Sequence, residues 1–339
     1  MIHTFKHRIT KRAFKSLSLL VYFFRYVYEM IFSLFEKSIR ISFTNFWPNL
    51  NPWFFLKPFK NSSRKYRIVK AYRPHIQFFS VFGEIKKLEK AKAGVKIFYT
   101  GENVNKAPYT VYEGNCIDKV SLSLGFDYGN AENYLRFPIW LLYYFSPDNS
   151  KDDIRVILNG FKKHRNKTKF CALVSRHDKG GLRTKMYDEI SKIANIDCPG
   201  KILHNDDTLQ NLYNDDKILY LQQYKFNICP ENSKSQGYVT EKIFQSLSSG
   251  CIPIYSGWSK DPEPGIINPN VIMWYDESDE ENNRYLMSEI KKLHENDKLF
   301  LSFSEQPYFC DTAVDKIYDY LYSFHTKISE LFDTVNIRN

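Results

Sequence analysis

The chain has 339 residues, of which 43% are hydrophobic and 17% aromatic, and its formal net charge is +10. This length and composition predict two globular domains with large buried cores and exclude a disordered chain. The charge is uneven, because residues 1–70 carry +12 and the other 269 residues carry −2. A near-neutral body argues against nucleic-acid binding, whereas a basic N-terminal segment is typical of contact with an anionic membrane surface.

The six cysteines are scattered along the chain and form no C-x-x-C pair. A zinc site needs clustered ligands, so none is expected. Isolated cysteines of this kind are typical of a reducing, cytosolic compartment.

The N-terminal segment joins a basic stretch to an apolar one. Residues 6–15 contain five Lys and Arg, and residues 16–35 are mainly Leu, Val, Phe, Tyr and Ile. Arg25 and Glu29 interrupt the apolar run, which argues against a helix that spans a membrane. At helical spacing the polar side chains fall on one narrow stripe: Ser18, Tyr22, Arg25, Glu29, Ser33 and Glu36.

This pattern predicts a basic amphipathic extension over residues 1–40, with residues 1–37 lying on the inner face of a membrane. Two alternatives stay open: a helix that packs on its own domain, and a single-pass signal anchor. Removal of residues 1–37 is expected to leave a soluble, active protein, whereas loss of folding would favour packing on the domain.

The first half of the body reads as a series of strands separated by turn residues. Phe137–Phe145 is a dense aromatic run, and Ser146–Asp153 has the composition of a linker. The strands are expected at Ile41–Phe46, Tyr66–Lys70, Ile76–Val81, Val95–Thr100 and Lys119–Leu124.

The second half alternates helices and strands, which predicts parallel sheets covered by helices on both faces. A final helix is expected over Thr312–Leu331. The other expected elements are helices at Ile154–His164, Leu182–Ala194 and Ser278–His294, and strands at Lys169–Ser175 and Val271–Trp274.

The most informative stretch runs from Tyr224 to Gly257 and predicts a strand, a polar loop, a helix and a second strand. Thr240 is expected to cap the helix, so that Glu241 and Lys242 fall in its first turn. Free backbone N–H groups at such a helix start favour a phosphate, and Lys242 adds a positive charge. The stretch therefore predicts a site for a phosphate-bearing ligand.

Three sequence blocks resemble the alpha-1,3-fucosyltransferases of glycosyltransferase family ten, in the order of that family. The central block is PENSKSQGYVTEK followed by IPIYSG. The others are IFYTGENV with GFDY and YLRFPIW, and FCALVS followed by Arg183. Arg176 and His177 stand where the family has Asn, Ser256-Gly257-Trp258 stands where many members have Trp-Gly, and Cys310 stands alone. These departures favour the bacterial branch over the secretory one.

The resemblance implies a GT-B fold, an α/β architecture in which two Rossmann-like domains face each other across a cleft. The expected domains are residues 1–40, the basic helical extension; 41–148, the acceptor side; 149–305, which binds GDP-fucose; and 306–339, a C-terminal helix. The implied reaction transfers L-fucose from GDP-fucose to a hydroxyl of a GlcNAc-containing glycan with inversion. The acceptor is expected to be a lactosamine-type glycan or a lipopolysaccharide O-chain.

The resemblance also gives roles to particular residues. Glu102 corresponds to the general base, with His177 as a weaker alternative, and Glu241 is the second catalytic candidate. Arg183 and Lys242 are expected to bind the diphosphate. The other expected donor contacts are Asn232, Tyr238, Glu231 and Ser175, although Glu231 could instead cap the loop. Arg136 is expected to be structural.

No D-x-D motif occurs, and the Asp pairs at 152–153, 206–207 and 215–216 lie in turn-like sequence. Two cations and a helix start can replace a metal electrostatically, so no obligatory metal or cofactor is expected, although a divalent ion could stimulate the enzyme. Two functional alternatives remain: a relative that uses another nucleotide sugar, and a non-catalytic protein that binds glycans or membranes.

Overall fold

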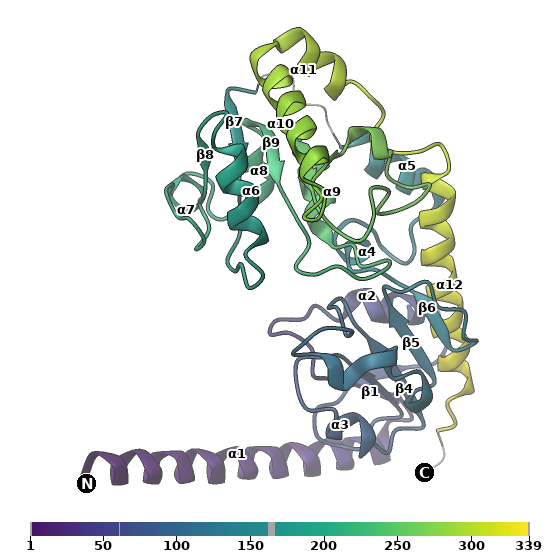
Figure 1. Ribbon diagram of the computed structural model, residues 1–339. Helices are drawn as coiled ribbons and strands as arrows, with labels where there is room; N and C mark the ends of the chain where they lie inside the picture. Colours follow the sequence, from purple (N-terminus) through teal and green to yellow (C-terminus); the bar gives the residue numbers. More distant parts are fainter. Residues whose placement is uncertain (1, 61, 162–166, 338–339) are drawn as a thin grey trace. The chain divides into compact units, whose positions relative to one another are not determined.

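The computed structural model describes residues 2–60, 62–161 and 167–337, with side chains from residue 17 onward. These residues form two compact units. Unit 1 comprises residues 1–124, 131–135 and 324–339, and unit 2 comprises residues 125–130 and 136–323. Each unit contains one sheet (Figure 1), and both sheets are built largely of parallel strand pairs.

Unit 1 contains a six-stranded sheet in the order β2-β1-β3-β4-β5-β6. Its strands are β1 (Ile39–Thr44), β2 (Tyr66–Ile68), β3 (Ile76–Phe79), β4 (Val95–Tyr99), β5 (Leu122–Gly125) and β6 (Tyr134–Arg136). Its helices are α1 (Ile2–Phe35), α2 (Trp53–Leu56) and α3 (Lys86–Glu89), with 3-10 turns at Lys57–Phe59 and Thr110–Lys119.

The core of unit 1 is rich in stacked aromatic rings. Phe43 and Phe78 stack at 4.8 Å on neighbouring strands, and Phe55 meets Tyr99 edge to face at 5.4 Å. The last part of α12 (Ala313–Thr334) also belongs to this unit, since Phe332 stacks on Phe59 at 4.2 Å. Aromatic pairs of this kind add directional packing to the burial of apolar area.

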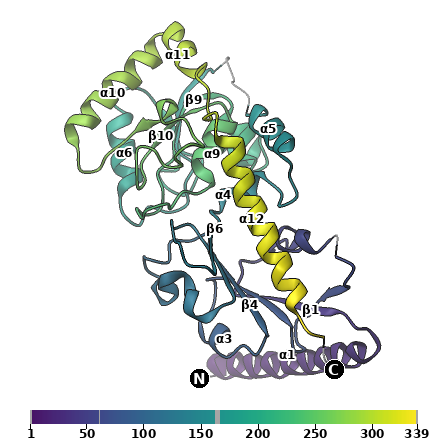
Figure 2. The ribbon, with the colours of Figure 1, turned by 90° about the vertical axis from the view of Figure 1, so that its right-hand side faces the viewer.

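Helix α1 lies along one end of unit 1 as a single rod (Figures 1 and 2). Its buried Glu29 carboxylate accepts the backbone N–H groups of Lys70, Ala71 and Tyr72 at 2.7–3.0 Å. Burial raises the pKa of Glu29, but these three hydrogen bonds outweigh it, so the net shift is downward. The Tyr22 hydroxyl also donates to the carbonyl of Ala71. Two residues of the polar stripe of α1 therefore contact the domain, whereas Ser18 and Arg25 of that stripe are exposed, as are apolar side chains such as Leu20 and Phe24.

Unit 2 contains a five-stranded sheet in the order β11-β10-β9-β7-β8. Its strands are β7 (Lys169–Ala172), β8 (Ile196–Asp197), β9 (Tyr224–Ile228), β10 (Ile252–Tyr255) and β11 (Met273–Trp274). Its helices are α4 (Trp140–Tyr144), α5 (Lys151–Asn159), α6 (Leu182–Ile190), α7 (Thr208–Asn211), α8 (Lys217–Leu221), α9 (Glu241–Ser248), α10 (Glu280–Glu295), α11 (Asp297–Ser304) and the first part of α12, with a 3-10 turn at Pro269–Val271.

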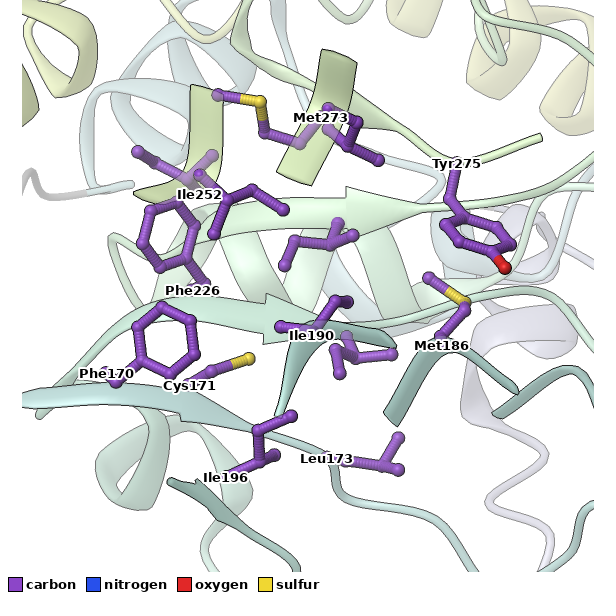
Figure 3. Close-up of a cluster of buried hydrophobic side chains, with 14 of the residues drawn as sticks. Phe170, Cys171, Leu173, Met186, Ile190, Ile196, Phe226, Ile252, Met273 and Tyr275 are labelled. Atoms are coloured by element: carbon purple, nitrogen blue, oxygen red, sulfur yellow. The ribbon is translucent and has the colours of Figure 1, made fainter. Parts of the chain in front are cut away.

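Two hydrophobic clusters cover the two faces of this sheet. The larger one packs strand residues such as Phe170 and Phe226 against α6, α10 and α11, as the labelled side chains of Figure 3 show in part. The smaller one joins Ala172 and Tyr224 to α7 and α8. A parallel sheet buried on both faces explains why its strands are nearly continuous apolar runs.

The predicted α/β fold with two parallel sheets and an extra N-terminal helix is confirmed, with local corrections. The expected strand at Lys119–Leu124 begins only at Leu122, because Lys119 ends a 3-10 turn. The expected helix at Ile154–His164 begins three residues earlier, since Ser150 and Asp153 form a capping box within the presumed linker. Residues 162–164 of that expected helix lie outside the described residues.

Candidate active site

The order in which the chain adds strands to the unit 2 sheet reverses between β7 and β9. From β7 the chain moves outward to β8, then returns to the other side of β7 as β9 and continues to β10 and β11. In parallel α/β sheets, ligands bind outside the carboxyl ends of the strands at such a switch point. The segments that follow the two strands are Leu173–His177 and Cys229–Asn232, and both contain residues singled out from the sequence.

Arg183 joins these two segments. Its side chain is buried, and it donates to the carbonyl of His177 at 3.0 Å, the carbonyl of Pro230 at 3.3 Å and Oδ1 of Asn232 at 2.8 Å. Burial lowers the pKa of Arg183, and nearby Asp178 and Glu231 oppose that shift. An arginine keeps its charge in such a setting, so Arg183 brings a fixed cation to the switch point.

The backbone of α6 holds Arg183 in place. The helix follows Gly181, whose φ of 74° lies in the left-handed region that favours glycine. Asp178 accepts hydrogen bonds from the backbone N–H of Arg183 and from the backbone N–H and hydroxyl of Thr184. These bonds satisfy N–H groups that a helix start leaves without partners, and they fix Arg183 in the first turn of α6.

Glu231 is the centre of a buried network at the start of α9. Its carboxylate accepts the backbone N–H of Thr240 at 2.8 Å, the Thr240 hydroxyl at 2.7 Å and Nζ of Lys242 at 3.1 Å. The Tyr255 hydroxyl lies 3.4 Å away. Thr240 occupies the N-cap position but its side chain does not cap the helix, because the hydroxyl bonds Glu231 and Lys242 instead. The expected Thr240 cap is therefore wrong.

Lys242 and Glu231 form a nearly buried ion pair. Burial by itself would lower the pKa of Lys242, but the Glu231 carboxylate, with a contribution from Glu241, raises it above the usual value. Breaking such a pair leaves an uncompensated buried charge, which is strongly destabilising. The network therefore fixes the loop and the start of α9. It also holds Lys242 in position through its ion pair with Glu231.

A pocket of about 660 Å³ opens beside this network. Predicted residues Ser175 and Glu241 line it, and Ser175 also donates to the His177 carbonyl that Arg183 bonds. Gly200 allows the close approach at its wall, since a Cβ atom there would lie 2.0 Å from the carbonyl oxygen of Ser175. The lining residues are Val174, Ser175, Arg176, Pro199, Gly200, Lys201, His204, Leu209, Asp215, Lys217, Glu241 and Gln245.

The far end of the polar loop is held by Arg136. This buried side chain donates to the carbonyl of Gly237 at 3.0 Å and pairs with the buried Glu263 at 2.6 Å. Trp140 also donates to Glu263. Tyr238, which follows Gly237 in the chain, is buried, and its ring centre lies 5.0 Å from that of Phe126. The structure thus supports the structural role expected for Arg136 and adds Glu263, which the sequence did not indicate.

Glu102 lies in unit 1, just after β4. The Thr100 hydroxyl accepts the backbone N–H of Glu102 and donates to its carbonyl, which fixes the turn. Burial and the nearby Glu102 carboxylate raise the pKa of Tyr109. Tyr109 meets Phe82 edge to face at 5.9 Å, and Phe82 meets Trp47 at 6.1 Å. A partly exposed aromatic cluster, Trp47, Phe82 and Tyr109, therefore lies beside the candidate base.

Sequence reasoning missed three basic side chains that line the pocket: Lys201 and His204 from the loop after β8, and Lys217 from the start of α8. Lys217 is the most buried of them, and its Nζ donates to Oε1 of Gln245 at 2.9 Å. Its sequence position, beside Asp215 and Asp216, gives only a turn signal, and Asp216 indeed caps α8. Across residues 2–60, 62–161 and 167–337, no group of three His, Cys, Asp or Glu is placed to hold a metal ion.

A parallel sheet with a polar pocket beside the carboxyl ends of its strands is typical of α/β proteins that bind nucleotides. Two family models match this chain. The "Alpha-(1,3)-fucosyltransferase FucT N-terminal domain" matches residues 41–143, and the "Glycosyltransferase family 10 (fucosyltransferase) C-term" matches residues 163–310.

Similar proteins agree with these matches. The alpha-(1,3)-fucosyltransferase FucT of Helicobacter pylori is 27% identical over 91% of this chain and 68% of that protein. A crystal structure of an alpha1,3-fucosyltransferase has a TM-score of 0.56 and 23% identity, covering 86% of this chain and 90% of the other. A second crystal structure, of an alpha1,3-fucosyltransferase with GDP-fucose, has a TM-score of 0.55 and 21% identity and covers 85% of this chain and 90% of the other. The chain belongs to glycosyltransferase family 10, the fucosyltransferases, and is therefore a glycosyltransferase.

Proposed function

We propose that this enzyme transfers L-fucose from GDP-fucose to a hydroxyl of a GlcNAc-containing glycan, forming an alpha-1,3 linkage with inversion. The observation that carries the donor half of the proposal is the pocket lined by the segments after β7 and β8 and by Glu241 at the start of α9, next to the network that holds Arg183 and Lys242. Fixed cations and free helix N–H groups favour a diphosphate. A solved relative of similar fold contains GDP-fucose.

In the proposed step the acceptor oxygen attacks C1 of fucose while its proton passes to the Glu102 carboxylate. The bond between C1 and the phosphate oxygen breaks, and GDP leaves with the bonding electrons. Arg183 and Lys242 stabilise the negative charge that develops on the diphosphate. Glu241 stabilises the positive charge that develops on the sugar ring, and Asn232, Tyr238, Glu231 and Ser175 complete the donor site by direct contact or by holding its loop.

We further propose that no metal ion is obligatory. The charge that a divalent cation would neutralise is met by Arg183, Lys242 and the start of α9, which all converge on one edge of the sheet. The expected result is that dialysis against EDTA changes the transfer rate by less than about twofold, because the residues above supply the largest electrostatic contribution. A loss that added Mg²⁺ or Mn²⁺ restores would overturn this part of the proposal.

The aromatic cluster Trp47, Phe82 and Tyr109 is our candidate for the acceptor side. Aromatic side chains supply large, rigid contact area, and Tyr109 of this cluster lies near the carboxylate that would take the proton. A sugar ring held there would present its hydroxyl near Glu102. The lactosamine-type or lipopolysaccharide identity of the acceptor is part of this proposal.

We also propose that α1 binds the inner face of a membrane. Leu17–Phe35 is long and apolar enough to cross a membrane by length and composition alone. However, Glu29 and Tyr22 on its polar stripe bind unit 1, while Leu20, Phe24 and other apolar side chains are exposed. An exposed apolar face with a basic lead-in favours interfacial binding over spanning.

The structure shortens the deletion that tests this. Removing residues 1–37 would take away Glu29, so the sharper variant lacks only residues 2–20 and is compared with Leu20→Asp/Phe24→Asp in the full chain. Both should shift from anionic phosphatidylserine vesicles to the soluble fraction while transfer to a soluble acceptor persists. Resistance of the full chain to alkaline carbonate extraction would instead establish a spanning helix.

The donor proposal is tested with full-length enzyme, a lactosamine-type acceptor, and GDP-fucose, GDP-mannose or UDP-sugars as separate donors. The expected result is turnover with GDP-fucose alone and a product whose linkage analysis gives alpha-1,3-fucose. Turnover only with another donor would reassign the substrate. Absence of turnover with all donors, in an enzyme that still binds glycans or vesicles, would favour the non-catalytic alternative.

A further inference from the structure

Lys217 is a half-buried cation that the mechanism above does not use. It opens helix α8, which packs on α9, and it lines the same pocket as Glu241 and Gln245. Glu241 and Gln245 are four residues apart and therefore lie on one face of α9. Lys217 thus lines the pocket itself, whereas Arg183 and Lys242 belong to the neighbouring hydrogen-bond network and are not among the lining residues.

The three cations differ in how their charges are satisfied. Lys242 is paired with the buried Glu231, and Arg183 donates to two carbonyls and to the Asn232 side chain. Lys217 instead donates to the neutral amide oxygen of Gln245 at 2.9 Å, and in the part of the chain that the structure describes it forms no ion pair. A half-buried ammonium with a neutral partner keeps an uncompensated charge, and a ligand that brings a negative charge would compensate it.

The surroundings of Lys217 agree with an unmet charge. Burial lowers the pKa of its ammonium group, and the neighbouring Lys242 and Arg183 add to that shift, whereas Glu241 opposes it. Like charges this close repel one another unless an anion lies between them. Because Lys217 lines the pocket and its charge is influenced by those of Lys242 and Arg183, the pocket fits a ligand of higher negative charge than a single carboxylate or phosphate monoester.

We propose that Lys217 is a third diphosphate-binding residue, which contacts the anionic part of a nucleoside diphosphate sugar in this pocket. The inference rests on the proposed function, since it takes GDP-fucose as the ligand. The neutral partner Gln245 holds Lys217 in position without cancelling its charge. Lys217 then adds affinity for the donor and for the departing nucleoside diphosphate.

The test measures equilibrium binding of GDP, inorganic pyrophosphate and guanosine to the full chain by calorimetry. Lys217→Met keeps most of the apolar stem, and we expect it to weaken GDP and pyrophosphate binding by about ten- to a hundredfold, with guanosine unchanged. Gln245→Glu keeps the lysine but gives it a counter-charge, so it should weaken the same two ligands. Lys217→Arg should retain most of the affinity, and the exposed Lys192→Gln serves as the matched control.

Equal GDP affinity in Lys217→Met and the original chain would overturn the inference and leave the proposed function intact. An equal loss for guanosine and GDP would also overturn it, because a general disturbance of the pocket would explain both. If the original chain binds pyrophosphate through Lys217 but does not bind GDP, the inference survives and the proposed donor fails. Thermal unfolding of each variant identifies any loss that comes from misfolding, and Gln245→Glu then decides the question.

Discussion

The two sheets of this enzyme share the order of their first five strands but differ at their carboxyl edges. In unit 1 the chain switches sides between β1 and β3, and in unit 2 between β7 and β9. Each edge contains a glycine that allows another group to approach closely. A Cβ atom on Gly83 would lie 2.1 Å from Oδ1 of Asn45, and one on Gly200 would lie 2.0 Å from the carbonyl oxygen of Ser175. The edge of unit 2 then gathers charges, whereas the edge of unit 1 gathers aromatic rings around one carboxylate.

This difference indicates how the two units divide the reaction. A charged edge with preformed hydrogen bonds suits a diphosphate, whereas an aromatic edge with one carboxylate suits a neutral sugar whose hydroxyl must lose a proton. The sheets themselves do not decide this, because function depends on the residues at their edges. Four substitutions test the division, each with a readout that assigns its effect to one unit.

The largest effect is expected from Glu102→Gln. The amide keeps the size of the side chain but cannot take a proton, so kcat should fall by about 10²- to 10⁴-fold, while GDP affinity stays unchanged. Steady-state kinetics with calorimetric GDP binding measures both, and the exposed Glu113→Gln is the control in the same unit. An unchanged kcat would remove Glu102 from the role of base, and His177 would be tested next.

Arg183→Lys should affect the unit 2 side. The guanidinium of Arg183 contacts His177, Pro230 and Asn232 at once, and a lysine ammonium cannot reproduce all three contacts. GDP affinity should therefore fall by about ten- to a hundredfold. The KM for the acceptor should not change. Arg155→Lys, on an exposed face of α5, controls for the loss of an arginine elsewhere in the unit. A selective rise in the acceptor KM would contradict the assignment of this edge to the donor.

Trp47→Ala tests the aromatic edge of unit 1. Loss of the ring should raise the acceptor KM by about tenfold, with donor affinity unchanged, because one stacked aromatic contact is removed. The matched control is Trp53→Ala, since Trp53 is exposed on α2 and lies outside the cluster. If both variants behave alike in acceptor titrations, the cluster is not the acceptor site.

The smallest effect, on stability alone, is expected from His75 in unit 1. Burial, with Arg40 and Arg64, lowers the pKa of His75 to about 4. Above pH 6.5 neither the folded nor the unfolded chain protonates this ring. As the pH falls from 6.5 toward 4, the unfolded chain binds the proton first, so the free energy of unfolding decreases, by on the order of 1 to 3 kcal/mol.

The measurement is hydrogen exchange of the β1 and β3 amides as a function of pH. The decrease in the free energy of unfolding between pH 6.5 and 4 should be smaller in His75→Gln than in the original chain. In both the variant and the original chain it should be weaker when measured at the amides of unit 2. An identical pH dependence in the original chain and in His75→Gln would show that His75 does not make this contribution.

Much of the fold could be predicted because its signals are local. The apolar run of β4 and the turn residues before α9 lie within a few positions of the elements they specify. The network around Glu231 was harder, because a Thr before a helix looks like a cap whether or not a distant carboxylate takes its hydroxyl. The Arg136–Glu263 pair, the lining role of Lys217 and the contacts of Glu29 in α1 all depend on which segments the fold brings together, and no local pattern records that.

The three backbone bonds to Glu29 have a mechanical consequence. A helix joined to its domain by a flexible linker would let the enzyme turn freely above a surface, and acceptors at many heights and angles could reach it. Here a buried carboxylate fixes the helix to residues 70–72, so helix and sheet turn together. If α1 lies on a bilayer, unit 1 is held at one tilt, and the acceptors it reaches are selected by their distance from the lipid as well as by their chemistry.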